Sequence, residues 1–152
     1  EVSSGMKGDK IRWKEFNPKS EEDLDYIGSL MSNAFVWSKD GATTFVSCAF
    51  QNPSGDWVHY VNYYFRKDGS IARIQAQLNA FHGYASVIRE MFYDPKGKLL
   101  SSSRQILDLE TKKEKKPDAD DAEFFDHPVP VYRTVKALPF HTLLSKPAAK
   151  TK

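Results

Sequence analysis

Two stretches of this chain contain the same short sequence motif, and together they restrict the fold more than any other feature. The stretches are residues 64–71 and, 28 residues further on, residues 92–99. Each places an aromatic pair before a polar turn, closes the turn with a glycine and restarts with an aliphatic residue. Apolar residues on both sides of a glycine-containing turn are typical of a β-hairpin. The centre of the chain is therefore predicted to be an antiparallel meander.

The strands of this meander can be placed from their residue pattern. Residues 71–81 alternate most clearly, with a period of two. One face would carry Ala72, Ile74, Ala76, Leu78 and Ala80, and the other Arg73, Gln75, Gln77 and Asn79. Further strands are expected at residues 43–51, 57–66, 84–93 and 98–109, with a last short strand at 131–137. Pro128 and Pro130 flank its start and favour a sheet edge, because proline cannot donate to a ladder.

One helix is expected before the sheet. Ser20 is a suitable N-cap, and the acidic residues 21–23 that follow it suit the positive end of a helix dipole. Apolar side chains then recur at helical spacing on one stripe, at Leu24, Ile27, Met31, Ala34 and Phe35. This pattern predicts an amphipathic helix of about four turns. We expect it to cover the small, alanine-rich face of residues 71–81.

The expected fold class is α+β, with this N-terminal helix packed on a twisted antiparallel meander of five to six strands. A chain of 152 residues is long enough for one domain with its own core. We place that domain at residues 20–145, after a polar N-terminal extension at 1–19 and before a disordered tail at 146–152. A charged loop is expected at 112–126.

Two resemblances follow from these patterns, and neither carries over functional residues. The repeated hairpin resembles the short β-hairpin units of YD-type and MORN-like proteins, in two copies within residues 57–109, where such arrays have three or more. The helix followed by a long meander is similar to the cystatin-like and nuclear-transport-factor-like folds. That second resemblance implies a curved sheet that wraps a helix.

Composition limits the partners and the location. A formal net charge of +2 does not predict a nucleic-acid partner, and no apolar run approaches the length of a membrane-spanning helix. Cys48 is the only cysteine, and its strand-like neighbours predict a buried, inert thiol. Because the sequence begins at Glu1 rather than methionine, we expect a processed, extracytoplasmic protein, either periplasmic or secreted.

No recognised catalytic or metal-binding motif is present in the sequence. The four histidines, His59, His82, His127 and His141, are scattered and repeat no ligand spacing, so neither a metal nor a cofactor is predicted. Glu90 is expected in the middle of a strand. We interpret it as a surface residue paired with a basic residue across the strand, Arg73 or Arg104.

The polar face of residues 71–81 is the best candidate site. Arg73, Gln75, Gln77 and Asn79 would form a row of hydrogen-bonding side chains. The neighbouring strand adds one of two sets to this face: His59, Val61, Tyr63 and Phe65, or Tyr60, Asn62 and Tyr64. The candidate ligand contacts are the row itself with Tyr63 and His59. The wet outer face of an antiparallel sheet would show much the same pattern.

Two functions are carried forward from the sequence, and whether the protein is an enzyme stays open. The leading hypothesis is a non-enzymatic binding domain whose polar, aromatic sheet face holds a protein or a polar small molecule or carbohydrate. The alternative is an enzyme or carrier with a pocket between helix and sheet, where His59, Glu90 and Tyr63 would act. A dimer joined by edge strands is a third class, and the oligomeric state is not predicted.

Overall fold

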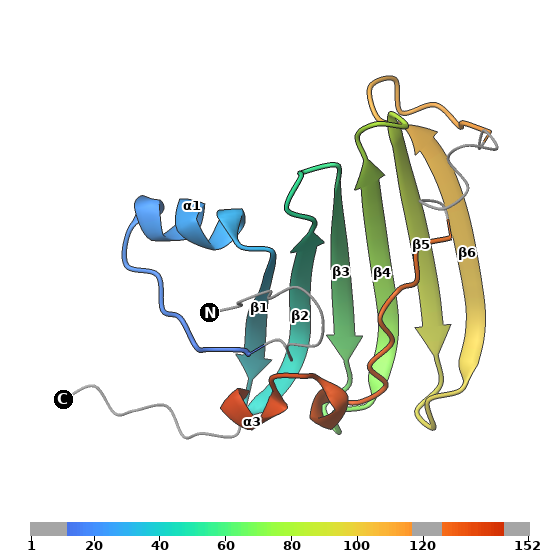
Figure 1. Ribbon diagram of the computed structural model, residues 1–152. Coiled ribbons are helices and arrows are strands. Elements are labelled where there is room, and N and C mark those ends of the chain that lie inside the picture. The colour runs from blue at the N-terminus through green and yellow to red at the C-terminus, as the bar shows by residue number, and fades with distance from the viewer. Residues whose placement is uncertain (1–11, 117–125, 145–152) are drawn as a thin grey trace.

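The computed structural model describes residues 12–116 and 126–144, and this part of the chain is built around one antiparallel sheet. Its strands follow one another in sequence order from one edge to the other (Figure 1). The helix α1 precedes the sheet, and two short helices follow it. The elements are α1 (Glu21–Ser29), β1 (Ser32–Lys39), β2 (Ala42–Gln51), β3 (Trp57–Phe65), β4 (Ile71–Ala80), β5 (Ala85–Tyr93), β6 (Leu99–Asp108), η2 (Val135–Ala137) and α3 (His141–Leu144). The predicted α+β class and antiparallel meander are confirmed.

Both repeated turns form the expected hairpins, and Arg66 joins one to the other. Gly69 and Gly97 close the turns with φ angles of 82° and 80°, a left-handed conformation that strains any residue with a Cβ. The guanidinium of Arg66, in the first turn, donates to the carbonyl oxygen of Tyr93 at 2.6 Å, where the second turn begins. The two turns therefore lie side by side at the same end of the sheet.

A C-terminal segment, residues 126–144, crosses the sheet near these turns (Figure 1). The amide of Val135 donates to the carbonyl oxygen of Gly69 at 3.0 Å, and the amide of Ile71 donates to that of Arg133 at 2.9 Å. These two hydrogen bonds attach the segment to the first hairpin. The segment can then place its apolar side chains on one face of the sheet.

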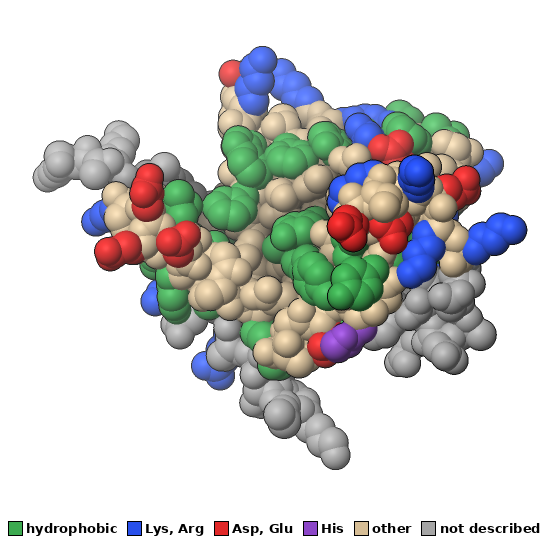
Figure 2. Space-filling view, turned by 90° about the horizontal axis from the view of Figure 1, so that it is seen from above, with side chains coloured by type: hydrophobic (Ala, Val, Ile, Leu, Met, Phe, Trp, Pro, Cys, Tyr) green, Lys and Arg blue, Asp and Glu red, His purple; other side chains and the backbone are tan. Residues whose placement is uncertain are grey.

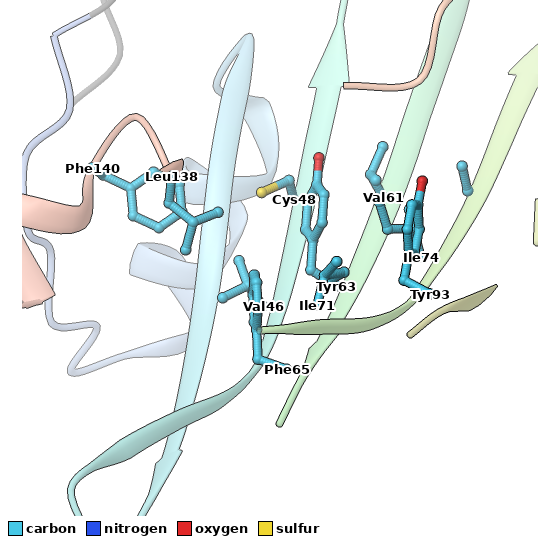
Figure 3. Close-up of a cluster of buried hydrophobic side chains, with 11 residues drawn as sticks. Val46, Cys48, Val61, Tyr63, Phe65, Ile71, Ile74, Tyr93, Leu138 and Phe140 are labelled. Carbon is cyan, nitrogen blue, oxygen red and sulfur yellow. The ribbon is translucent and has the colours of Figure 1, made fainter. Parts of the chain in front are cut away.

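That face and the C-terminal segment together make the main core. Leu138 and Phe140 from the segment meet buried side chains of the central strands, as Figure 3 shows. The strand residues of this cluster alternate along the strands, as a half-buried sheet requires, except for a register shift between Ile71 and Ile74 in β4. They are Val46, Cys48, Val61, Tyr63, Phe65, Ile71, Ile74, Ala76 and Tyr93. We call this side of the sheet the covered face.

The predicted long helix is wrong in its second half. Ser20 caps α1 as expected, its hydroxyl accepting from the amide of Asp23 at 3.2 Å. The helix ends at Ser29, however, and Ala34 and Phe35 lie in β1. The apolar residues here fit both a helix and a strand, because Phe35 and Trp37 would share one face of a strand and Ala34 the other. Hydrogen bonding to β2 makes this segment a strand.

The expected packing of the helix on the sheet is wrong as well. Only Ile27 of α1 is buried, and it belongs to neither of the two buried clusters. The helix lies beside β1, beyond the edge of the sheet (Figure 1). The C-terminal segment takes its place on the alanine-bearing face. Phe140 packs there against Trp13, with ring centroids 4.7 Å apart.

The strand expected at residues 131–137 is also absent. A single bridge joins Ser70 to Thr134, and η2 follows at once. The outer residues of the N-terminal extension (1–11), the middle of the charged loop (117–125) and the C-terminal tail (145–152) lie outside the described residues. No helix in the described part of the chain has the length and apolar character needed to cross a membrane.

Candidate binding face

The side of the sheet opposite the C-terminal segment holds the polar row predicted from β4. Arg73, Gln75, Gln77 and Asn79 all lie there, partly exposed, and α1 does not lie over them. Their strand neighbours Ile74, Ala76 and Leu78 are buried on the covered face. We call the side with the polar row the open face.

Tyr63 and His59 do not share this face. Tyr63 is fully buried in the main core, and His59 is only 3% exposed. Successive residues of a strand point to opposite sides, so the register of β3 decides which of the two possible sets joins the polar row. Tyr60 pairs with Gln77, Asn62 with Gln75 and Tyr64 with Arg73. The second set, Tyr60, Asn62 and Tyr64, is therefore the one on the open face.

A row of aromatic side chains crosses the open face at right angles to the strands. Trp37 pairs with Phe45, Phe45 with Tyr64, Tyr64 with Arg73, and Arg73 with Phe92. The ring centroids of Trp37 and Phe45 are 4.9 Å apart, and those of Phe45 and Tyr64 are 5.0 Å apart. We call these five residues the aromatic row. The sequence alone missed both Trp37 and Phe45. Ala34 and Phe35 of the strand that holds Trp37 belong to the predicted helical stripe, so no strand is expected there. Phe45 lies in the predicted strand at 43–51, but the sequence does not give its alignment with Tyr64.

Arg73 completes the aromatic row as its only cation. Its guanidinium carbon lies 5.2 Å from the ring centroid of Tyr64 and 5.5 Å from that of Phe92, within the range of a cation–π contact. The same group forms an ion pair with Glu90, which also accepts from the Gln75 amide at 3.4 Å. Glu90 is thus the cross-strand partner of Arg73 that the sequence analysis expected.

A polar hollow lies beside the aromatic row in the centre of the open face. Its volume is about 280 Å³, close to the lower end of the range for small-molecule sites. Amide and hydroxyl groups form most of it, between the side chains of Tyr60 and Ile88. The remaining lining residues are Ser47, Asn62, Gln75 and Gln77.

The central part of the open face carries no net charge. The register places four rows of side chains across it, each beginning at β1 or β2. These rows are Trp37, Phe45, Tyr64, Arg73, Phe92 and Ser101; Phe35, Ser47, Asn62, Gln75, Glu90 and Ser103; Asn33, Ala49, Tyr60, Gln77, Ile88 and Gln105; and Gln51, Val58, Asn79, Ser86 and Leu107.

Within these four rows only Arg73 and Glu90 are charged, and they neutralise each other. In the whole chain, by contrast, 28% of residues are charged. Figure 2, seen from above the view of Figure 1, shows acidic side chains grouped at α1 and mixed basic and acidic side chains at the opposite end of the sheet. Charged side chains are therefore frequent elsewhere on the surface.

The covered face holds a pair of histidines. The rings of His59 and His127 are 5.5 Å apart, edge to face. Burial, with the charges of His127 and Arg89, lowers the pKa of His59 to about 4, and burial also lowers that of His127. His82 lies elsewhere, 2.7 Å from Asp56. Within residues 12–116 and 126–144, no three histidine, cysteine or acidic side chains gather as a metal site would require.

The residues of the alternative hypothesis do not meet. Glu90 lies on the open face, whereas His59 and Tyr63 lie on the covered face, so the thickness of the sheet separates the carboxylate from the other two. Cys48 is buried as expected, and burial raises the pKa of its thiol to about 12. A thiol with that pKa is a poor nucleophile at neutral pH.

An apolar cleft of about 330 Å³ lies at the edge of the sheet next to α1. It lies between α1 and the sheet edge, and His59, Glu90 and Tyr63, which the alternative hypothesis places in such a pocket, are not among its lining residues. Side chains from α1, β1, α3 and the N-terminal segment form it. They include Trp13, Phe16, Ile27, Leu30, Ala34, Val36, Phe140, Leu143 and Leu144.

Comparison of the chain with protein-family models, with curated proteins and with solved structures found no match.

Proposed function

We propose that this protein is a non-enzymatic binding domain, and that its open face holds an uncharged, polar ligand. The observation that carries this proposal is the aromatic row, aligned strand by strand beside a hollow lined with amides. Exposed aromatic side chains offer large contact areas at low cost in conformational entropy, and amides fix the orientation of a polar ligand. Trp37 is 50% exposed and Tyr60 is 43% exposed, so both rings are accessible to a ligand.

A catalytic role has less support on this face. General acid–base catalysis needs a titratable group that can exchange a proton with a bound substrate. Glu90 is the only carboxylate in the four rows of the open face, and its charge is already paired with Arg73. Ligand binding without catalysis is the simpler interpretation of such a surface. We keep the extracytoplasmic location expected from the sequence as part of the proposal, and fractionation of the native source tests it.

The second candidate function is transport or storage of a small apolar molecule in the edge cleft. The observation that favours it is the apolar lining between Ile27, Val36 and Leu143. The two candidates use different parts of the molecule. An assay that reports on individual residues therefore separates them.

Nuclear magnetic resonance of the labelled protein provides that assay. A panel of small uncharged probes, comprising simple sugars, primary amides and short fatty alcohols, is titrated into the protein. The proposal expects the sugar or amide probes to shift the backbone resonances of Asn62 and Gln75. Shifts confined to Ile27 and Leu143 would transfer the function to the cleft, and an open face unmoved by every probe would overturn the proposal.

A further inference from the structure

We infer that the ligand of the open face is a neutral carbohydrate chain lying across the strands. This inference rests on the proposed function and assigns a ligand class to the same face. It draws on three properties of the face: its backbone is already paired, its charge is balanced, and its apolar and polar groups lie in adjacent rows.

The paired backbone argues against an extended peptide as the ligand. Strands β2 to β5 each pair with a neighbour on both sides, so their backbone donors and acceptors point along the sheet. A peptide gains most of its affinity for a sheet from main-chain hydrogen bonds at a free edge. On the open face it would meet side chains alone. A ligand whose own side groups supply the hydrogen bonds is better suited.

The hydrogen-bonding groups of the hollow suit hydroxyl groups. The amides of Asn62 and Gln75 each offer donors and an acceptor, and the hydroxyl of Ser47 offers both. A sugar hydroxyl likewise donates and accepts. Such groups can therefore pair in either direction without leaving an unpaired partner, which is costly in a desolvated site.

The apolar groups are placed to receive the other surface of a sugar ring. The C–H groups of a pyranose form an apolar face, which contacts aromatic rings favourably. Tyr60 lines the hollow, and Tyr64 of the aromatic row follows the lining residue Asn62 two residues further along β3. A sugar ring in the hollow would therefore meet the ring of Tyr60 and the amides of the lining, with the aromatic row alongside.

Charge complementarity selects a neutral chain. The only charges in the four rows, Arg73 and Glu90, already pair with each other. A polyanion such as a nucleic acid or an acidic polysaccharide would have to break this pair to gain a cationic partner. A neutral glycan leaves the pair and the cation–π contacts of Arg73 in place.

The rows also give the ligand a direction. Neighbouring strands are about 4.8 Å apart, so the path from β1 to β6 is about 24 Å long. That path crosses the hollow with the aromatic row along one flank. The hollow, at about 280 Å³, receives one ring of the chain, and the neighbouring rings lie over Phe35 at one side and next to Phe92 of the aromatic row at the other.

The experiment titrates four hexameric probes into the labelled protein and measures affinity by calorimetry and residue shifts by magnetic resonance. The probes are β-linked glucose, β-linked N-acetylglucosamine, α-linked galacturonic acid, and an uncharged peptide of serine, glutamine and tyrosine. We expect at least one neutral glycan to bind, with shifts at Asn62, Gln75 and Tyr64. The acidic glycan should bind at least about tenfold more weakly.

Two matched pairs of variants locate the contact. Tyr60→Ala on the open face is compared with Tyr84→Ala, another exposed tyrosine, which lies in the turn before β5. Gln75→Ala is compared with Asn17→Ala, which removes an exposed amide in the segment before α1 and off the sheet. Tyr60→Ala and Gln75→Ala should each weaken glycan binding about fivefold or more, with Tyr84→Ala and Asn17→Ala close to wild type.

The outcomes separate this inference from the function on which it rests. If the peptide shifts the open face and neither neutral glycan does, the carbohydrate inference is wrong and the binding function stands. If the acidic glycan binds as tightly as the neutral ones, the neutral class is wrong. If no probe shifts resonances of the open face, both the carbohydrate inference and the proposed binding function are wrong. Equal losses in both members of each variant pair would also overturn the inference.

Discussion

The hydroxyl of Tyr63 donates a hydrogen bond to the carbonyl oxygen of Pro130, with 2.9 Å between the two oxygen atoms and 67 residues between them in sequence. Tyr63 lies in the second half of β3, and Pro130 lies in the C-terminal segment. This contact joins the meander to the segment that covers it. It also explains why Tyr63, suggested by the sequence as a ligand contact, is fully buried.

Replacing Tyr63 by phenylalanine tests the structural role of this hydrogen bond. Tyr63→Phe keeps the ring packing against Tyr132 and leaves the Pro130 carbonyl without its donor. We expect the free energy of unfolding to fall by about 1 kcal/mol, as measured by urea denaturation. Tyr64→Phe on the open face is the control and should change stability little. A Tyr63→Phe protein as stable as wild type would contradict this role.

Replacing Gly28 in α1 and Gly69 in the first repeated turn by alanine should change the stability of the protein in opposite directions. Gly28 lies in α1, and an added methyl group would meet nothing within 4 Å, so Gly28→Ala should stabilise the protein by about 0.5 kcal/mol. Gly69 has a φ of 82°, so Gly69→Ala should destabilise it by about 1–2 kcal/mol. Thermal denaturation measures both changes. A stabilising Gly69→Ala would show that this turn tolerates a side chain.

The stability of the fold should depend on pH through His59. Burial lowers its pKa from 6.5 to about 4, so between these values the unfolded state binds more protons than the folded state. The free energy of unfolding should therefore be nearly constant between about pH 7 and pH 8 and fall as the pH drops from 6.5 towards 4. The contribution of His59 to the slope should reach at most about 1.4 kcal/mol per pH unit. Urea denaturation at several pH values measures it.

Two comparisons isolate the contribution of His59 to this slope. His59→Gln removes the titrating group and should flatten the curve, although His127, whose pKa is also lowered, adds in the same direction. Ser102→Ala, on an exposed part of β6 and without a titrating group, should leave the slope unchanged. The lowered carboxyl pKa values of Asp56, Asp68 and Asp108 contribute stability that is lost as the pH falls below about 5, at the acid end of this window. A flat wild-type curve between pH 6.5 and 4.5 would rule out a buried, neutral His59.

Cys48 should react with thiol reagents only when the protein unfolds. Its side chain is 1% exposed, and burial raises the thiol pKa to about 12, so the reactive thiolate is scarce in the folded state. We expect labelling by a chromogenic disulfide at pH 8 to be slow in buffer and fast in denaturant. The unfolded protein is its own control. Rapid labelling of the native protein would show that the segment over Cys48 opens readily.

The meander could be predicted because its signals are local. The strand β4 alternates in residue type, and Gly69 and Gly97 occur where their turns require a positive φ. The end of α1 could not be placed in this way, because Ala34 and Phe35 satisfy a helical stripe and a strand alternation at once. Hydrogen bonding to β2 is a long-range interaction, and it decided between them.

The candidate site likewise has one part that local sequence signals predict and another that depends on pairing between strands. The amide row of β4 was found from sequence, since one strand alone reveals its two faces. The partners on β3 could not be assigned, because a register shift of one residue exchanges Tyr63 for Tyr64 on a given face. Trp37 and Phe45 entered the site only once the strands were aligned across the sheet.

The sequence by itself determined the hairpins, the position of the polar row and the buried state of Cys48, because each depends on residues close together in the chain. The tertiary structure decided which layer covers the sheet. Residues 126–144 return to the first hairpin through Arg133 and Val135 and bury Leu138 and Phe140 on the apolar face. Their burial there keeps α1 at the edge and leaves the amides and the aromatic row on the other side in contact with solvent.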